Sequence, residues 1–348
     1  MTEPVSFEGV AARDRLNGLL KTKSCLVADG AMGTNLFALG LETGDAPELW
    51  NVEHPERVIE LHQRMVDAGA DIILTNSFGG SRHRLKLHRA EARVAELNRA
   101  AARLAREVAD RAARPVLVAG SMGPTGEILE PVGALSAAEA VDAFREQAEA
   151  LAEGGADMLW VETMSSREEA QAAIDGGRDC GLPIVCTMTF DTNGRTMMGL
   201  TPEAAIDFYC HRDPALAACG ANCGNGFGEL IAAVAGMRRA GGESGPVLVA
   251  KGNCGIPEFV DGEIRYTGTP ELMKTYARMA RDAGARIIGG CCGSTPEHIR
   301  AIVEALDGYQ PGPLPDLGGI DEKLGLNRAA AVPEGRRQER TRRGRRHA

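Results

Sequence analysis

Eight short apolar runs, each followed by an Ala-rich stretch with charges along one face, repeat between residues 25 and 306 of this 348-residue chain. The apolar runs are rich in Val, Ile and Leu and predict buried strands, whereas the stretches between them predict amphipathic helices. The predicted strands cover residues 25–31, 71–78, 115–123, 158–164, 183–190, 218–223, 246–253 and 286–292. The predicted helices cover residues 54–68, 91–113, 136–154, 166–179, 202–210, 227–240, 269–283 and 295–306.

Eight successive strand-then-helix units predict a closed (β/α)8 TIM barrel of the α/β class. The alternative, an open doubly wound sheet, usually carries a Gly-rich dinucleotide loop after its first strand, and residues 29–34 lack that spacing. Ser136 with Glu139 three residues later predicts a capping box at one helix start. We therefore expect a lead-in helix over 1–24, one barrel over 25–308, and a Pro- and Gly-rich, then basic, flexible tail over 309–348.

Charge and cysteine content exclude several protein classes. The net charge of −9 argues against general nucleic-acid binding, although residues 336–348 hold seven Arg and one Glu. That basic segment is expected to be a solvated tail, and an anchor for nucleic acid is the alternative. Nine cysteines are not a disulfide framework in a chain of this length, and no apolar run reaches the roughly 18 residues of a membrane span. We expect a cytoplasmic protein with reduced thiols and no membrane partner.

Polar or reactive groups close seven of the eight predicted strands, where a barrel of this class carries its chemistry. Asp29 and Glu162 directly follow apolar strand residues, which is a costly place for an unpaired carboxylate. These two acids are candidates to hold the ammonium group of a substrate.

Three cysteines form the most specific motif. Cys223 follows a glycine-containing strand end, and Cys291 and Cys292 follow Gly289 and Gly290 about seventy residues later. Three thiolates that leave one position vacant suit a zinc ion that accepts an outside ligand, and a thiol ligand there stays deprotonated near neutral pH. The sequence thus predicts a zinc enzyme that activates a thiol. A structural zinc site in a binding protein is the non-enzyme alternative. The six other cysteines are expected to pack as small apolar residues.

The chain closely resembles the homocysteine S-methyltransferase family over about residues 22–308. The resemblance is carried by the motifs at residues 29–34, 75–78, 123–124, 162–164, 220–223 and 289–293. It implies a zinc site made of Cys223, Cys291 and Cys292. It also implies that Asp29 and Glu162 bind the amino group of homocysteine, with Gly30 in the same substrate site and Ser121 orienting the amino acid. The implied product is methionine, made from homocysteine and a small methyl donor.

Members of this family differ in their methyl donor. Betaine enzymes use glycine betaine, others use S-methylmethionine or S-adenosylmethionine, and cobalamin-dependent methionine synthases use a corrinoid. Glycine betaine is the favoured donor here, and a stand-alone module served by a separate corrinoid protein is the main alternative. Betaine enzymes place tyrosines where this chain has Thr163 and Gly79. Trp50 or Tyr209 is therefore a candidate to supply the aromatic face that a quaternary ammonium prefers.

Overall fold

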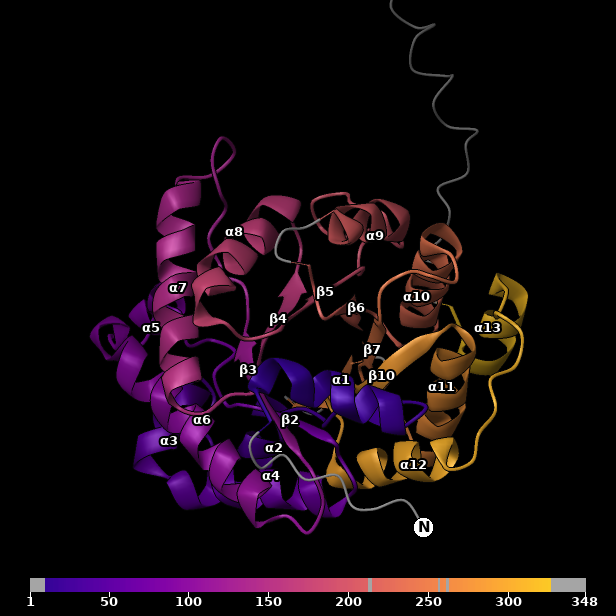
Figure 1. Cartoon of the computed structure of the whole chain (residues 1–348), viewed down its shortest axis with the longest axis horizontal. Helices are drawn as coiled ribbons and strands as arrows, with labels where there is room; N and C mark the ends of the chain where they lie inside the picture. Colours follow the sequence, from indigo (N-terminus) through magenta and orange to yellow (C-terminus); the bar gives the residue numbers. More distant parts are fainter. Residues whose placement is uncertain (1–9, 212–214, 256, 261–262, 327–348) are drawn as a thin grey trace, which may run out of the picture.

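A barrel of eight parallel strands forms the centre of the molecule (Figure 1). The computed structural model describes residues 10–211, 215–255, 257–260 and 263–326. The sheet order is β1-β10-β7-β6-β5-β4-β3-β2, and a bridge between Ala28 and Ile72 joins its two edges. The strands are β1 (Leu26–Val27), β2 (Ile72–Leu74), β3 (Leu117–Met122), β4 (Met158–Met164), β5 (Ile184–Met188), β6 (Ala218–Cys223), β7 (Leu248–Gly252) and β10 (Ala285–Gly290). The predicted (β/α)8 barrel is therefore confirmed.

Some strand boundaries agree with the predicted ranges, whereas others fall short of the predicted end. β4 and β6 match the predicted ranges, but β2 ends at Leu74 rather than at residue 78. The reason is a pair of tight turns, in which Ser77 donates a backbone hydrogen bond to Thr75 and Gly80 donates one to Ser77. These turns fold residues 75–80 over the mouth of the barrel instead of extending the strand.

Helices follow the strands as the apolar periodicity predicts. Those of the barrel repeat are α4 (Pro55–Asp67), α6 (Val94–Arg111), α7 (Ala137–Glu153), α8 (Arg167–Gly177), α9 (Pro202–Cys210), α10 (Phe227–Gly241), α11 (Pro270–Asp282) and α12 (Pro296–Leu306). The capping box at Ser136 and Glu139 is present at the start of α7. Proline occupies the first turn of α9, α11 and α12, where its missing N–H costs no helical hydrogen bond.

Several short elements lie outside the repeat and were not predicted. They are the helices α2 (Gly33–Ala38), α3 (Trp50–Glu53) and α5 (Arg82–Lys86), the 3₁₀ turns η1 (Pro47–Leu49), η2 (Glu91–Arg93) and η3 (Arg178–Cys180), and a hairpin of β8 (Pro257–Val260) and β9 (Glu263–Tyr266). Segments this short carry too few residues for an apolar period to be recognised. η1, α2, α3 and α5 occupy the loops after β1 and β2, and residues of three of these four elements line the pocket described below.

Two elements flank the barrel at the ends of the described chain. α1 (Ala12–Thr22) lies across the barrel in Figure 1, and its Leu16, Leu19 and Leu20 pack with the side chains that fill the interior. α13 (Leu317–Leu324) lies beside α10 and α11 and falls within the segment predicted as a tail. The basic residues 336–348 lie outside the described residues. Within the described chain, no helix has the length and apolar character needed to cross a bilayer.

The core has two layers, as the alternation of side chains along a strand requires. Residues such as Ala218, Trp160 and Ile287 fill the barrel interior, whereas Cys219 and Cys186 belong to the layer between strands and helices. Cys219 is therefore buried away from the mouth and does not join Cys223. Most polar strand-end residues lie at the opposite end of the barrel from α1.

Candidate metal centre and substrate pocket

A pocket of about 390 Å³ opens at the carboxyl ends of the strands. It is lined by residues from the ends of β2, β3, β4, β6, β7 and β10 and from the loops that follow β1, β2 and β10. Six of the seven site residues predicted from the sequence line this pocket: Gly30, Ser121, Glu162, Cys223, Cys291 and Cys292. The seventh, Asp29, is buried at its floor and contacts the lining residue Lys251. The barrel therefore brings together residues that are up to about 260 positions apart in the sequence.

The three predicted zinc ligands form one cluster. The Sγ atoms of Cys223, Cys291 and Cys292 all lie within 4.8 Å of one another, and each side chain is half-buried. Asn253, at the end of β7, connects the two segments that carry them. Its amide nitrogen donates a hydrogen bond of 2.6 Å to the carbonyl of Gly224, and its amide oxygen accepts one of 3.1 Å from the backbone of Cys292.

The backbone at Cys223 is in the left-handed region, with φ of 61°, and Thr163 at the end of β4 has φ of 64°. Both conformations are uncommon for residues other than glycine, and they cost of order 1–3 kcal/mol each. The side chain of Asn222, next to Cys223, holds Thr163: its Oδ1 accepts from the backbone of Thr163 at 2.8 Å and from Thr187 Oγ1 at 2.7 Å, and its Nδ2 donates to Thr163 Oγ1 at 2.7 Å. This amide thus braces the strand end from which Cys223 projects.

Without a cation, the three thiols are poor acids. The hydrogen bond with Cys291 lowers the pKa of Cys223, but the bond with Cys292 and burial outweigh it and raise that pKa to about 11. For Cys292, the bond with Cys223 lowers the pKa, while Cys291 and burial raise it to about 12. Thiols crowded in this way need a positive charge to ionise together, which a metal ion supplies.

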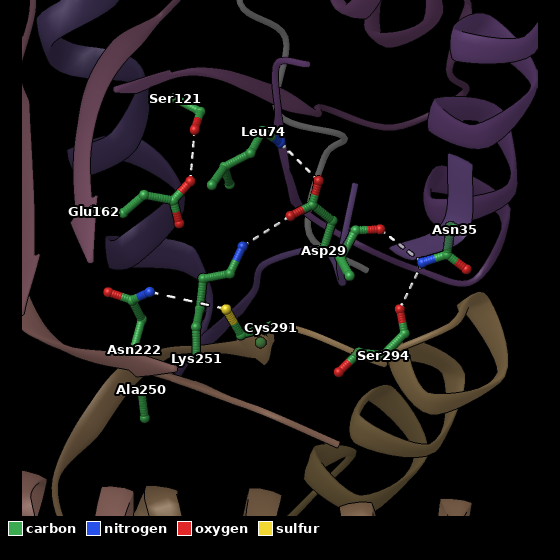
Figure 2. Close-up of polar contacts among 12 residues, drawn as sticks. Asp29, Asn35, Leu74, Ser121, Glu162, Asn222, Ala250, Lys251, Cys291 and Ser294 are labelled. Carbon is green, nitrogen blue, oxygen red and sulfur yellow. Dashed lines mark hydrogen bonds and ion pairs between the residues drawn. The ribbon is translucent and has the colours of Figure 1, made fainter. Parts of the chain in front are cut away.

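Two buried carboxylates lie beside the cluster (Figure 2). Glu162 Oε1 accepts a hydrogen bond of 2.5 Å from Ser121 Oγ, and Asp29 Oδ2 accepts one of 2.7 Å from the backbone of Leu74. Burial raises the pKa of both carboxyl groups, and the positive charge of Lys251 is the largest opposing influence. Asp29 is 2 % exposed and Glu162 is 8 % exposed, so that only Glu162 keeps a side-chain surface toward the pocket.

Sequence reasoning missed Lys251, a charged residue at the centre of this site. Its Nζ lies 3.0 Å from Asp29 Oδ1, and the residue is 2 % exposed. Burial lowers its pKa, but the charges of Asp29 and Glu162 more than compensate and leave the pKa above its usual value. The signal was present in the sequence, because a lysine that follows the apolar run 247–250 within a predicted strand needs a buried partner.

The candidate aromatic residues are placed elsewhere than expected. Trp50 is buried on α3, where it contacts His54, and Tyr209 is buried on α9 with its hydroxyl directed to the carbonyl of Gly220; neither lines the pocket. Phe37 and Phe78 do line the pocket, and they are 45 % and 38 % exposed. They come from the loops after β1 and β2, whose course the sequence did not predict.

The family model described as homocysteine S-methyltransferase matches residues 26–306. The chain belongs to the homocysteine S-methyltransferase family. Among solved structures, the oxidised form of the homocysteine methyltransferase MmuM from Escherichia coli is 27 % identical with a TM-score of 0.68, over 83 % of this chain and 99 % of that one. The metallated form is 26 % identical with a TM-score of 0.68, over 83 % and 98 %.

A more distant likeness concerns the fold alone. The carboxyl transferase domain of Rhizobium etli pyruvate carboxylase is 13 % identical with a TM-score of 0.51, over 90 % of this chain and 48 % of that one. Membership of this family makes the protein a methyltransferase. The non-enzyme alternative, a binding protein with a structural zinc site, is therefore set aside.

Proposed function

We propose that the protein transfers a methyl group to the sulfur of homocysteine at a zinc site and so forms methionine. The observation that carries the proposal is the cluster of Cys223, Cys291 and Cys292 beside a pocket with two buried carboxylates. The thiols supply a place for the substrate sulfur, and the carboxylates supply a place for an amino group. An amino-acid thiol of short chain length satisfies both ends.

The residues present fit a zinc ion. Zinc–sulfur bonds of about 2.3 Å in a tetrahedron place sulfurs about 3.8 Å apart, and the three Sγ atoms here lie within 4.8 Å of one another. Three cysteines leave a fourth position for an outside ligand. When bound, zinc would keep the substrate thiol deprotonated near neutral pH. A free thiol, with a pKa of about 8.5, is mostly protonated at that pH.

The chain's own residues orient the amino acid. Glu162, held by Ser121, presents a carboxylate to the substrate ammonium, and Gly30 lines the same pocket. The substrate sulfur attacks the donor methyl carbon, a carbon–sulfur bond forms, and the leaving group departs with the electrons of its former bond to that carbon. Because the sulfur carries no proton at that stage, the step requires no general base. Alignment of sulfur and methyl is the main contribution of the pocket walls.

Glycine betaine is the proposed donor, with S-methylmethionine and a methylated corrinoid protein as alternatives. Phe37 and Phe78 place aromatic surface at the pocket, and the face of an aromatic ring attracts an onium cation. Glu48 lines the same pocket as a buried carboxylate whose Oε1 accepts a hydrogen bond of 2.6 Å from the backbone of Gly79. A small cationic donor therefore meets both aromatic and acidic groups at this end of the pocket.

The test is a donor panel with purified, zinc-loaded protein and homocysteine, in which methionine is measured. We expect turnover with glycine betaine. Turnover with the methylated corrinoid protein alone would assign the alternative donor, and no methionine from any donor would contradict the proposed function.

Phe78→Ala is expected to raise KM for a small onium donor by about 2- to 30-fold, because a cation–π contact of about 0.5–2 kcal/mol is lost. KM for homocysteine should change little. Leu314→Ala is the matched control, since Leu314 has the same 38 % exposure but does not line the pocket. An unchanged donor KM in Phe78→Ala would remove this residue from donor binding.

Asn222→Ala is expected to weaken zinc binding by about 10- to 100-fold, the usual effect of losing a group that orients a metal ligand. The reason is that its amide braces the neighbouring Cys223, and its Nδ2 lies 3.9 Å from Cys291 Sγ. Competition with a chromophoric chelator measures the affinity. Asn225→Ala, which removes a half-buried amide two residues beyond Cys223 that donates to the carbonyl of Asp191 and not to the residues of the cluster, should bind zinc as the wild type does. Equal affinities in both variants would contradict the bracing role.

A further inference from the structure

Lys251 is the buried cation of the pocket. It projects from β7 toward Asp29, as Figure 2 shows, with its Nζ 3.0 Å from Asp29 Oδ1 and 5.5 Å from the ring centroid of Trp160. A lysine in such a place is costly unless it is paired, and its partner here is the carboxylate of Asp29, which follows β1, two strands away in the barrel and 222 residues away in the sequence. Lys251 therefore balances the negative charge of the pocket, and the packing of the apolar core does not require it.

The ion pair makes the two carboxylates unequal. Asp29 Oδ1 accepts a hydrogen bond from Lys251 Nζ, and its Oδ2 accepts one from the backbone of Leu74. Glu162 has one oxygen on Ser121, and within the described chain no group donates to its other oxygen. Two carboxylates and one ammonium leave a single net negative charge, which matches one substrate ammonium.

We propose that Lys251 is a built-in counter-ion that occupies Asp29 and leaves Glu162 as the carboxylate that binds the α-ammonium group of the substrate. Lys251 and Asp29 are then positioning residues, and Glu162 is the binding residue. This differs from the expectation that Asp29 and Glu162 bind the amino group together. The inference rests on the proposed function, because it takes an amino-acid thiol as the substrate.

The charges also argue against a direct role of Lys251 in binding the substrate carboxylate. A carboxylate that approached its Nζ would enter the space beside Asp29 and Glu162, and like charges in a buried site repel strongly. The α-carboxylate is therefore assigned to Gly30, which lines the same pocket and has no charged side chain of its own.

The test measures binding of L-homocysteine to zinc-loaded protein by isothermal titration calorimetry. Glu162→Gln should weaken binding by about 10- to 100-fold, as loss of a charge-assisted hydrogen bond does. Asp29→Asn should also weaken it by about 10-fold or more, because the freed ammonium of Lys251 turns to Glu162 and competes with the substrate. The decisive variant is Asp29→Asn with Lys251→Met, which removes the ion pair as a unit. Binding there should recover to within about fivefold of the wild type.

Two ligand analogues identify the group that each variant affects. 4-Mercaptobutyrate lacks the amino group, so Glu162→Gln should not weaken its binding. 3-Mercaptopropylamine lacks the carboxylate and should lose affinity in Glu162→Gln as homocysteine does. Lys274→Met is the control for loss of a lysine, because Lys274 pairs with Glu271 and Glu304 on the outside of the barrel. Its binding should be unchanged.

Each outcome separates the two levels of inference. If zinc-loaded wild-type protein does not bind homocysteine, the proposed function fails. If the wild type binds but the double variant stays as weak as Asp29→Asn, Asp29 contacts the substrate and the counter-ion proposal fails. If circular dichroism shows that the double variant is unfolded, the single variant Lys251→Met is tested with 4-mercaptobutyrate instead. Weaker binding of this ligand, which carries a carboxylate and no amino group, would show that Lys251 binds the substrate carboxylate and would overturn the proposal.

Discussion

Cys223→Ala is expected to abolish methyl transfer, with activity falling by at least about a thousandfold, and to leave the purified protein with less than a tenth of the wild-type zinc content. Two thiols and a half-buried gap cannot hold a tetrahedral ion that must also accept a substrate sulfur. The barrel should remain folded, because the cysteine projects at the mouth and takes no part in either core layer. Metal analysis and methionine formation, measured on the same preparation, check both expectations.

Cys210→Ala provides the control for loss of a thiol. Cys210 is exposed at the end of α9 and lies outside the cluster, so this variant should keep full zinc content and activity. A metal-free Cys223→Ala protein that retained wild-type activity would show that the reaction does not need the cluster. Loss of the far-ultraviolet circular dichroism signal in Cys223→Ala would show that the site also stabilises the fold.

The barrel could be predicted from the sequence because each strand is an apolar run and several helices have a capping residue or a proline at their start. Placing Cys223 near Cys291 and Cys292 followed from the architecture alone, since the ends of β6 and β10 lie at the same rim. The conformation that joins them could not be predicted. The left-handed backbone of Cys223 and the bracing of Thr163 by Asn222 depend on contacts between strands and have no local sequence signature.

The pocket walls were harder to predict than its floor. Phe37 and Phe78 reach the pocket from loops whose course is set by short helices and tight turns, so an aromatic residue gives no sign of where it points. Trp50 was an equally reasonable candidate by residue type, yet it packs inward on α3. Lys251 differs from these cases, because an unpaired charge inside an apolar strand is itself a prediction of a partner, although the identity of that partner comes only from the fold.

Gly220→Ala is expected to destabilise the barrel by about 3 kcal/mol or more and to reduce zinc binding with it. A Cβ atom at this position would lie 2.1 Å from the carbonyl oxygen and 2.7 Å from the nitrogen of Val249 on the neighbouring strand β7. Both contacts are with backbone atoms of the paired strand, so no side chain can rotate away. β6 would have to move away from β7, and such a shift carries Cys223 away from Asn253 and from the two thiols that follow β10. Urea unfolding and metal analysis measure the two effects.

Gly18→Ala is the matched control, and it should change stability in the opposite direction. Gly18 lies within α1, and a Cβ atom there meets nothing within 4 Å. Alanine in a helix interior is favoured over glycine, so a gain of about 0.4–1 kcal/mol is expected. If Gly220→Ala unfolded at the same urea concentration as the wild type and bound zinc normally, β6 and β7 would tolerate separation. Gly220 would then have no role in holding the metal centre together. If instead stability fell while zinc binding in the folded fraction stayed normal, the glycine would serve strand packing alone, and the position of Cys223 would depend chiefly on Asn222.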